Sequence, residues 1–251
     1  EQLSRLAGIE VEVRVEAVPG TPPHEDDGLR WRTRQRYVEL PDGRRGMRKH
    51  RSHDVVEVED CLIAGPPADH VVHGIGFETE AGGFWQVHPG APEVLVDTVL
   101  AFLEPQRGES VLDLYAGVGL FARFLADAVG DPSGVTLVEG DRRACAQAEA
   151  NVPGATVLPG EVGAVLRGLP VARVDLVVLD PPREGARRTV VEAVAARAPR
   201  AVAYVACDPA ALARDVAIFG EHGYVLDRLR AFDLFPMTHH VECVALLRPA
   251  S

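Results

Sequence analysis

From about residue 91 onward, short apolar runs alternate with alanine-rich amphipathic stretches, and this alternation constrains the fold more than any other feature. Apolar strands separated by helices predict a parallel sheet that helices cover on both faces, because such strands have no solvent-facing side. The expected strands are 111–115, 135–139, 155–158, 174–180 and 201–206. The expected helices are 120–129, 142–151, 161–168, 187–197 and 209–220.

Two more strands follow the last of these helices. The segments 225–232 and 241–247 are apolar, and too few residues lie between them for a helix, so we expect an antiparallel hairpin. Five strand–helix units closed by such a hairpin resemble class I methyltransferases, whose sheet is Rossmann-like. The expected fold is therefore α/β, with this sheet and its antiparallel C-terminal hairpin preceded by a small β-rich region.

The first 90 residues differ in texture from the rest of the chain. Residues 9–18 and 30–38 alternate with the period of two that is typical of a strand, and a loop is expected over 19–28. Further short strands are expected over 55–59, 72–78 and 84–88. We therefore expect a small β-rich region over 1–90 and a methyltransferase-like domain over 91–251.

Basic residues concentrate in one segment of an acidic chain. The formal net charge is −11, from 26 Lys+Arg and 37 Asp+Glu, but residues 30–51 hold nine basic and two acidic residues. That segment carries +7 and the remaining chain −18, which argues for a local basic stripe and against nucleic-acid binding by the whole surface. With strand period, one face of the stripe holds Arg30, Arg32, Arg34 and Arg36. A solvated strand face is the alternative interpretation.

Composition excludes several classes of protein. Hydrophobic residues make up 47% and charged residues 25%, which excludes a disordered chain, and no apolar run reaches the ~20 residues of a membrane span. The chain begins at Glu1 without a secretory leader, so we expect a cytoplasmic fragment of a longer protein. The four cysteines form no Cys-x-x-Cys pair, so we expect reduced thiols and no metal site.

A glycine-rich turn, DLYAGVG, follows the first strand of the parallel region at residues 113–119. Gly117 and Gly119 allow a tight turn and close approach of the backbone to a ligand. Glu139 ends the next strand, where a carboxylate can bind ribose hydroxyls. This pattern is typical of a nucleoside cofactor and does not separate NAD from S-adenosylmethionine. A plain tight turn between strand and helix is the alternative.

Two later strands end in groups that can carry chemistry. Two prolines follow Asp180 and hold its carboxylate on a rigid backbone, and Arg183 comes next, where it suits a phosphate or a base edge. Cys207 ends the fifth strand beside a helix N-terminus, a position that lowers the pKa of a thiol and exposes its sulfur. A capped turn and an inert buried cysteine are the structural alternatives.

Glu242 lies just inside the last expected strand. Because that strand is expected to be antiparallel, its start shares a sheet edge with the ends of the fourth and fifth strands, so Glu242 would meet Asp180 and Cys207. Burial would raise the pKa of this carboxyl, which suits a general base. A salt bridge at the strand end is the structural alternative.

In this order, the motifs around Gly117, Asp180, Cys207 and Glu242 resemble the RNA uracil-5 methyltransferase family, whose members methylate carbon 5 of a uridine in transfer or ribosomal RNA. The resemblance implies that S-adenosylmethionine is the cofactor, that Cys207 is the nucleophile adding to carbon 6, and that Glu242 is the base. The expected cofactor contacts are the two glycines of the turn, Gly117 and Gly119, and four positions that match the family: Gln86, Tyr115, Glu139 and Asp180.

The resemblance also implies an RNA substrate, with ribosomal RNA favoured over transfer RNA. Arg32, Arg34 and Arg183 are expected to contact that RNA, together with the region 1–90, and neither a membrane nor an obligatory protein partner is expected. An amino-group base methyltransferase and a catalytically silent RNA-binding module remain as alternatives. An NAD dehydrogenase would leave Cys207 and the other strand-end groups unexplained.

Overall fold

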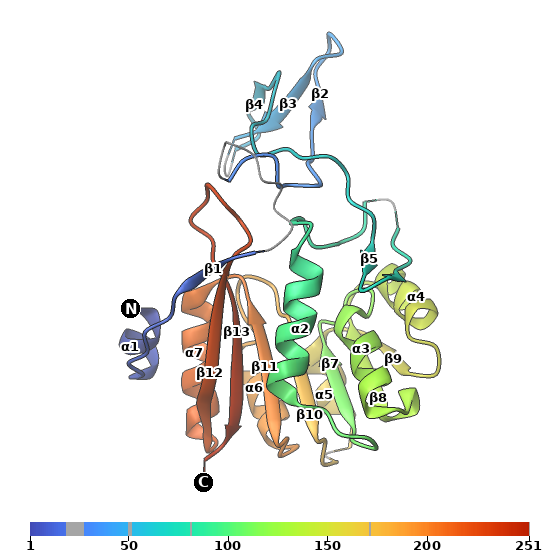
Figure 1. Ribbon diagram of the computed structural model, residues 1–251, viewed down its shortest axis with the longest axis vertical. Coiled ribbons are helices and arrows are strands. Elements are labelled where there is room, and N and C mark those ends of the chain that lie inside the picture. The colour runs from blue at the N-terminus through green and yellow to red at the C-terminus, as the bar shows by residue number, and fades with distance from the viewer. Residues whose placement is uncertain (19–27, 50–51, 81, 171, 251) are drawn as a thin grey trace.

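A computed structural model describes residues 1–18, 28–49, 52–80, 82–170 and 172–250 (Figure 1). Its centre is an eight-stranded sheet with the strand order β1-β12-β13-β11-β10-β7-β8-β9. The five parallel strands of its core are β7 (Val111–Leu114), β8 (Val135–Glu139), β9 (Thr156–Pro159), β10 (Leu176–Leu179) and β11 (Ala201–Ala206). The α/β fold with a mostly parallel sheet is therefore confirmed.

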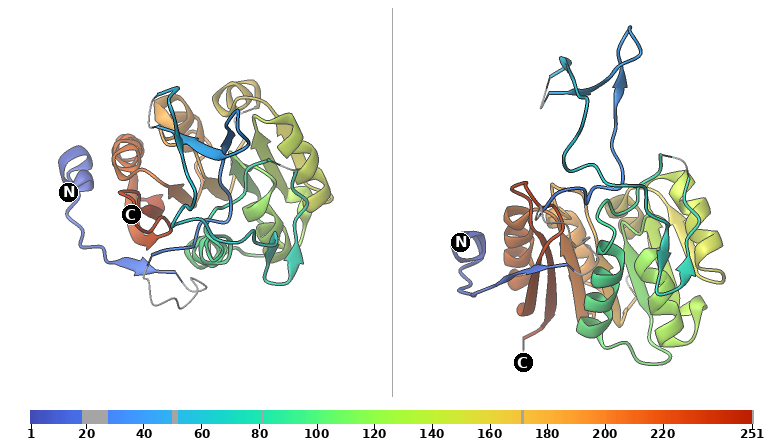
Figure 2. Two further views of the ribbon diagram at one scale, coloured as in Figure 1. Left: turned by 90° about the horizontal axis from the view of Figure 1, so that it is seen from above. Right: turned by 45° about the horizontal axis from the view of Figure 1, so that its top comes forward.

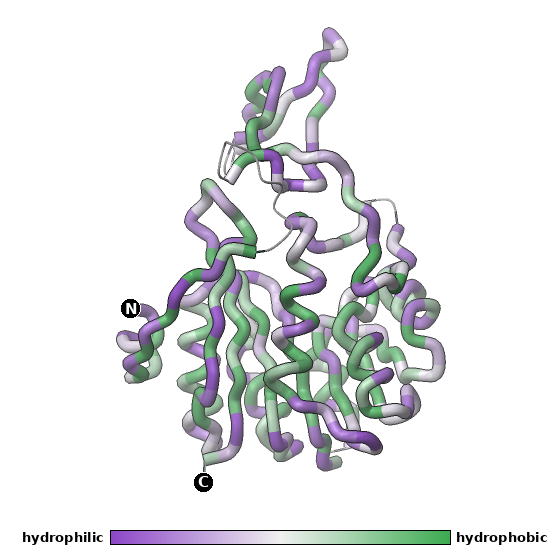
Figure 3. The backbone as a smooth tube through the Cα atoms, in the orientation of Figure 1, coloured by the Kyte–Doolittle hydropathy of each residue, from purple (hydrophilic) through white to green (hydrophobic). Residues whose placement is uncertain are grey.

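Helices cover both faces of this sheet. One apolar core lies beneath α2 (Ala91–Leu103), α3 (Leu120–Val129) and α4 (Arg142–Asn151). The second core lies beneath α5 (Val162–Gly168), α6 (Arg187–Ala195) and α7 (Pro209–Glu221). Every residue of β10 and β11 is buried, which explains why these strands are apolar throughout. In Figure 3 the central strands are accordingly drawn in the colours of hydrophobic residues.

The chain ends in the expected antiparallel hairpin, β12 (Tyr224–Asp233) and β13 (Glu242–Pro249). Strand β13 also runs antiparallel to β11, with Ala206 opposite Cys243. The start of β13 therefore lies at the edge where β11 ends, which brings Glu242 to the level of Cys207. A short 3-10 helix, Pro132–Gly134, precedes β8. Among the described residues, no helix is both long and apolar enough to cross a membrane.

The N-terminal residues join the large sheet. Strand β1 (Val15–Ala17) pairs in parallel with β12, and α1 (Gln2–Ala7) lies against α7. The strand expected over 9–18 is therefore shorter than expected, and it belongs to the edge of the large sheet. Most of the loop expected over 19–28 lies outside the described residues.

A separate three-stranded antiparallel sheet projects beyond the carboxyl edge of the large sheet (Figures 1 and 2). It consists of β2 (Val38–Glu39), β3 (Arg45–Arg48) and β4 (Val55–Glu57), and a small hairpin follows, formed by β5 (Val71–Val72) and β6 (Ile75–Gly76). Residues 30–36 form one isolated bridge, Arg32 with Ala64, and residues 84–88 form no strand. The strands expected there were wrong.

Candidate active site

A cleft of about 1530 Å³ opens at the carboxyl edge of the parallel strands. The loops at 32–38 and 83–87 and the projecting sheet border it on the side away from the large sheet. It brings together almost all the residues that the sequence singles out: Arg32, Arg34, Gln86, Tyr115, Gly117, Glu139, Asp180, Arg183, Cys207 and Glu242. Gly119 is the exception, because it does not line the cleft.

The glycine turn is held by the carboxylate of Glu139. The backbone N–H of Gly117 donates to Oε2 of Glu139 at 2.8 Å, and that of Asp141 donates to Oε1 at 2.7 Å. Gly117 has a positive φ of 55°, and a Cβ built on it would meet nothing within 4 Å. The turn therefore presents bare backbone to an open part of the cleft, a shape that fits the nucleoside part of a cofactor.

Gly119 serves a different purpose from Gly117. Its φ is 86°, and a Cβ there would lie 2.8 Å from Cγ2 of Val152 and 3.4 Å from Cδ2 of Leu137. The second glycine of the turn is therefore required by the packing of the start of α3 against its neighbours. Its expected contact with a cofactor has no support in the position that it occupies.

Three strand ends place Asp180, Cys207 and Glu242 in the cleft. Burial raises the pKa of Asp180 to about 7. Glu242 is 4% exposed, and burial followed by the charge of Asp180 raises the pKa of its carboxyl well above the usual range. These two carboxyl groups form an acidic cluster, and their negative charge favours the protonated state of neighbouring groups such as the Cys207 thiol.

The expectation of a lowered thiol pKa for Cys207 was wrong. Burial, followed by the charges of Glu242 and Asp180, raises the pKa of this half-buried thiol to about 11, while the charge of Arg183 and a backbone hydrogen bond act in the opposite direction. The N-terminus of α7 gives the sulfur little help, because Asp208 already caps it. Oδ1 of Asp208 accepts from the N–H groups of Ala210 at 2.9 Å and Ala211 at 2.8 Å.

The loop before β13 adds two cleft residues that the sequence analysis did not single out, Phe235 and His240. Their rings meet edge to face at 5.9 Å. Trp31, which is 2% exposed, supports this loop, since its Nε1–H donates to the carbonyl of Pro236 at 3.2 Å. Burial, followed by the charge of Arg183, lowers the pKa of His240. The sequence signal for Phe235 and His240 was their position just before the last strand, which was expected to start at the edge of the sheet where β10 and β11 end.

The cleft also contains acidic helix caps that were not predicted as site residues. Glu161 accepts from the N–H groups of Gly163 at 2.9 Å and Ala164 at 2.6 Å, and Asp141 caps α4 in the same manner. Both residues line the cleft. Their signal in the sequence is an acidic residue two positions after a strand end, directly before a helix.

The basic stripe does not form one free face. Arg30 is paired with Asp60 at 2.5 Å, Arg44 with Asp42 at 2.6 Å, and Lys49 with Asp54 at 3.8 Å. Arg51 lies outside the described residues. The members that line the cleft are Arg32, Arg34, Arg36 and Arg48.

Arg34 also holds the loop that carries Gln86. Its guanidinium donates to the carbonyls of Gly82 and Gly83. Thr33 ties the same loop, because its N–H and its hydroxyl both donate to the carbonyl of Val87 at 2.9 Å. Gln86 therefore faces the cleft from a loop that is fastened at two points.

The sheet order, the terminal hairpin and the glycine turn facing the cleft define a class I methyltransferase. A family model for tRNA (uracil-5-)-methyltransferases matches residues 168–250, and one for the methyltransferase small domain matches residues 90–204. An uncharacterised RNA methyltransferase of Streptomyces avermitilis is 39% identical, over 100% of this chain and 76% of the relative. One of Streptomyces coelicolor is 38% identical, over 100% and 72%. The chain belongs to the RNA uracil-5 methyltransferase family.

A solved structure resembles this one in both fold and sequence. It is the tRNA (uracil-54, C5)-methyltransferase of Pyrococcus abyssi in complex with S-adenosyl-L-homocysteine. The TM-score is 0.61 and the identity 28%, over 76% of this chain and 48% of the archaeal chain. This chain therefore spans about half the length of the archaeal enzyme.

Proposed function

We propose that this chain transfers a methyl group from S-adenosylmethionine to carbon 5 of a specific uridine in RNA. The observation that carries the proposal is the meeting of Asp180, Cys207 and Glu242, which come from three separate strands, in the cleft that also holds the glycine turn. In folds of this kind, ligands bind at the carboxyl ends of the strands, where these groups lie.

The cofactor would occupy the part of the cleft beside the glycine turn. Gly117 offers bare backbone there, and Glu139 has lone pairs left for ribose hydroxyls after accepting its two backbone bonds. Tyr115, Gln86 and Asp180 line the rest of the path toward Cys207. When bound, S-adenosylmethionine supplies an electrophilic methyl group.

Cys207 and Glu242 would divide the chemistry on the uracil ring. Addition of the Cys207 thiolate to carbon 6 forms an S–C bond and moves an electron pair onto carbon 5, which can then take the methyl group. Glu242 accepts the proton from carbon 5, the electrons of that C–H bond restore the ring double bond, and the thiolate of Cys207 leaves. The raised pKa of Glu242 makes its carboxylate a stronger base.

The uridine must leave its stack before it can reach Cys207, at a cost of a few kcal/mol that is smaller in loops. Arg32, Arg36 and Arg48 line the cleft from the side of the projecting sheet, where they can contact flanking phosphates. We propose ribosomal RNA as the first target to test and transfer RNA as the second. The names of the matching family model and of the archaeal enzyme both refer to transfer RNA.

The test is a denaturing gel of the protein with S-adenosylmethionine and RNA that contains 5-fluorouridine. Fluorine at carbon 5 cannot leave as the proton does, so a methylated adduct at carbon 6 would stay bound to the protein. We expect a band that survives denaturation and disappears in the variant Cys207→Ala. Cys61→Ala is the matched control, because Cys61 is equally half-buried but does not line the cleft.

A Cys207→Ala variant that still methylates normal RNA would contradict the covalent route. Such a result would favour methylation of an amino group of a base, for which no thiol is needed. If neither methylation nor binding of S-adenosylmethionine is found, the chain is a silent RNA-binding module. Assays with ribosomal and transfer RNA fragments side by side then identify the substrate of an active protein.

A further inference from the structure

One fully buried carboxylate, that of Asp215 on α7, is saturated with hydrogen bonds outside the cleft. Its Oδ2 accepts from the hydroxyl of Tyr204 at 2.6 Å, from the N–H of Ala186 at 2.8 Å and from the N–H of Arg187 at 3.1 Å. Its Oδ1 accepts from Nε and Nη2 of Arg214 at 2.9 and 2.8 Å. Nothing in the proposed chemistry uses this group.

Asp215 caps a helix other than its own. The N–H groups of Ala186 and Arg187 open α6, and no side chain of the residue at the N-cap position bonds to them. A carboxylate is favoured at that position by both the free N–H groups and the helix dipole. The start of α6 is therefore anchored to α7 through Asp215.

The loop before α6 is bound just as closely. Gly185 has a φ of 76°, and a Cβ there would lie 2.5 Å from Nη2 of Arg214 and 2.6 Å from Oδ2 of Asp215. Nη2 of Arg214 also donates to the carbonyl of Glu184 at 2.7 Å. The loop that runs from Asp180 to α6 is thus fastened directly after Arg183.

The other partners of Asp215 flank the proposed nucleophile. Tyr204 lies in β11, three residues before Cys207, and α7 begins two residues after Cys207. The same carboxylate therefore joins the strand–helix unit that carries Cys207 to the loop that carries Arg183. Arg183 lines the cleft and is the cation that favours the thiolate of Cys207.

We propose that Asp215 is a positioning residue, which, together with Tyr204 and Arg214, holds the Arg183 loop in place against Cys207. This positioning role matters for catalysis only if Cys207 is the nucleophile, and in that respect it rests on the proposed function. The hydrogen bonds predict that loss of Asp215 releases the loop directly after Arg183. Because Arg183 is a cation that lines the same cleft as Cys207, its displacement should make the thiolate of Cys207 harder to form.

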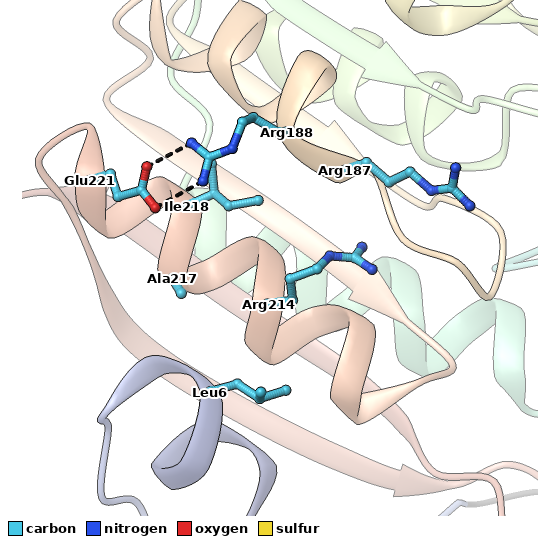
Figure 4. A pocket seen from close by; sticks show the side chains of 7 residues that line it. All are labelled: Leu6, Arg187, Arg188, Arg214, Ala217, Ile218 and Glu221. Atoms are coloured by element: carbon cyan, nitrogen blue, oxygen red, sulfur yellow. Dashed lines mark hydrogen bonds and ion pairs between the residues drawn. The ribbon is translucent and has the colours of Figure 1, made fainter.

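A surface ion pair provides a matched control. Arg188 of α6 donates to Glu221 of α7 at 2.6 and 3.0 Å, so it joins the same two helices. Figure 4 shows this pair beside Arg214, which reaches from α7 toward the start of α6, whereas Arg187 points away from the pair. Both partners of the control pair are about half exposed, and among the described residues neither side chain forms a hydrogen bond or ion pair with Asp215.

The test measures how fast iodoacetamide alkylates Cys207 as a function of pH, with the modified peptide identified by mass spectrometry. In Asp215→Asn, an NH2 group replaces one acceptor oxygen, so the Arg183 loop should be released. We expect the rate at pH 8 to fall roughly threefold or more, as expected when a nearby cation is lost. Arg183→Gln should give the same fall, and Arg188→Gln should give none.

The double variant of Asp215→Asn with Arg183→Gln decides the mechanism. If Asp215 acts through Arg183, the double variant alkylates no more slowly than either single variant. Additive losses, or an unchanged rate in folded Asp215→Asn, would overturn the proposal. Should Asp215→Asn fail to fold, Tyr204→Phe removes one bond to the carboxylate and should give a smaller fall in the same direction. These alkylation rates need no RNA, so they stand even if the uracil chemistry fails.

Discussion

At the scale of single residues, the structure separates groups that look alike in the sequence. Asp113, Asp180 and Asp215 each lie at or near the carboxyl edge of the sheet, but their surroundings differ. Asp113 is buried within β7, Asp180 lines the cleft, and Asp215 caps α6. Oδ2 of Asp113 accepts from the N–H of Ala122 at 3.0 Å, and its Oδ1 has no hydrogen-bond partner among the described residues. Burial raises the pKa of Asp113 to about 8.

Asp113 should make stability depend on pH in a direction opposite to that of most carboxyl groups. Because its pKa is raised in the folded protein, its contribution is fully present below about pH 4 and is lost as the pH rises toward 8. Relative to Asp113→Asn, the wild type should therefore lose on the order of 1.4 kcal/mol of unfolding free energy per pH unit in that window. Urea unfolding at pH 5 and pH 7.5 measures the difference.

The control for this prediction is Asp131→Asn. Asp131 is exposed and accepts from the N–H and hydroxyl of Ser133, which lower its pKa, so its contribution changes only at acid pH. Its variant should keep a constant difference from the wild type between pH 5 and pH 7.5. A constant difference for Asp113→Asn as well would show that this carboxyl is ionised throughout the range.

At the scale of elements, the turns between strands and helices follow one scheme. Acidic caps at Asp141, Glu161 and Asp208 begin α4, α5 and α7, and the glycine turn begins α3. Helix α6 has no local cap and takes one from Asp215. The caps satisfy backbone N–H groups at the edge where ligands bind, and so they keep that edge rigid.

The two glycines of the turn should respond differently to the same substitution. Gly119→Ala combines a left-handed backbone with a clash against Val152, so it should cost about 2–3 kcal/mol of unfolding free energy. Gly117→Ala meets open space and should cost about 1 kcal/mol. Only Gly117→Ala should lower the affinity for S-adenosylhomocysteine by more than the loss of folded protein, measured by thermal unfolding, can explain. Equal stability losses would contradict the packing role of Gly119.

At the scale of the whole molecule, the projecting sheet and the large sheet face each other across the cleft. The catalytic candidates come from the large sheet, and Arg32, Arg34, Arg36 and Arg48 line the same cleft from residues 32–48. In the proposed function the large sheet would therefore carry the chemistry, and the projecting part would supply positive charge for a polyanion. This division is consistent with an RNA substrate that enters between the two.

RNA affinity should depend on the cleft arginines and much less on the paired ones. Arg36→Gln should weaken RNA binding and reduce the slope of affinity against salt concentration by about 1, because one phosphate contact is lost. Arg44→Gln removes an arginine that Asp42 and Glu57 already neutralise, so it is the control. Binding curves at several salt concentrations provide the test, and identical slopes for both variants would contradict this RNA path.

The periodic pattern of apolar residues in the sequence was enough to predict the parallel core of this protein. The bounds of α3 and α4 agree with the residues 120–129 and 142–151 expected from the sequence, and the terminal hairpin formed as expected. These features depend on which side chains are buried, and burial leaves its period in the sequence. Helix α2 carries the same signal, since its buried residues Leu95, Val99 and Phe102 recur at helical spacing, although it was not among the expected helices. The pairing of β1 with β12 left no such signal, because the two strands lie far apart along the chain.

Tertiary structure alone decided the electrostatics of the site. The sequence placed Cys207 beside a helix N-terminus and near Glu242, and it predicted a lowered pKa. In the folded protein Asp208 caps that terminus, and burial, followed by the charge of Glu242, raises the pKa instead. The sequence likewise predicted four arginines on one face, whereas Asp60 removes Arg30 from it. A pKa or an ion pair depends on every charge within a few ångströms, and only the folded chain decides which charges those are.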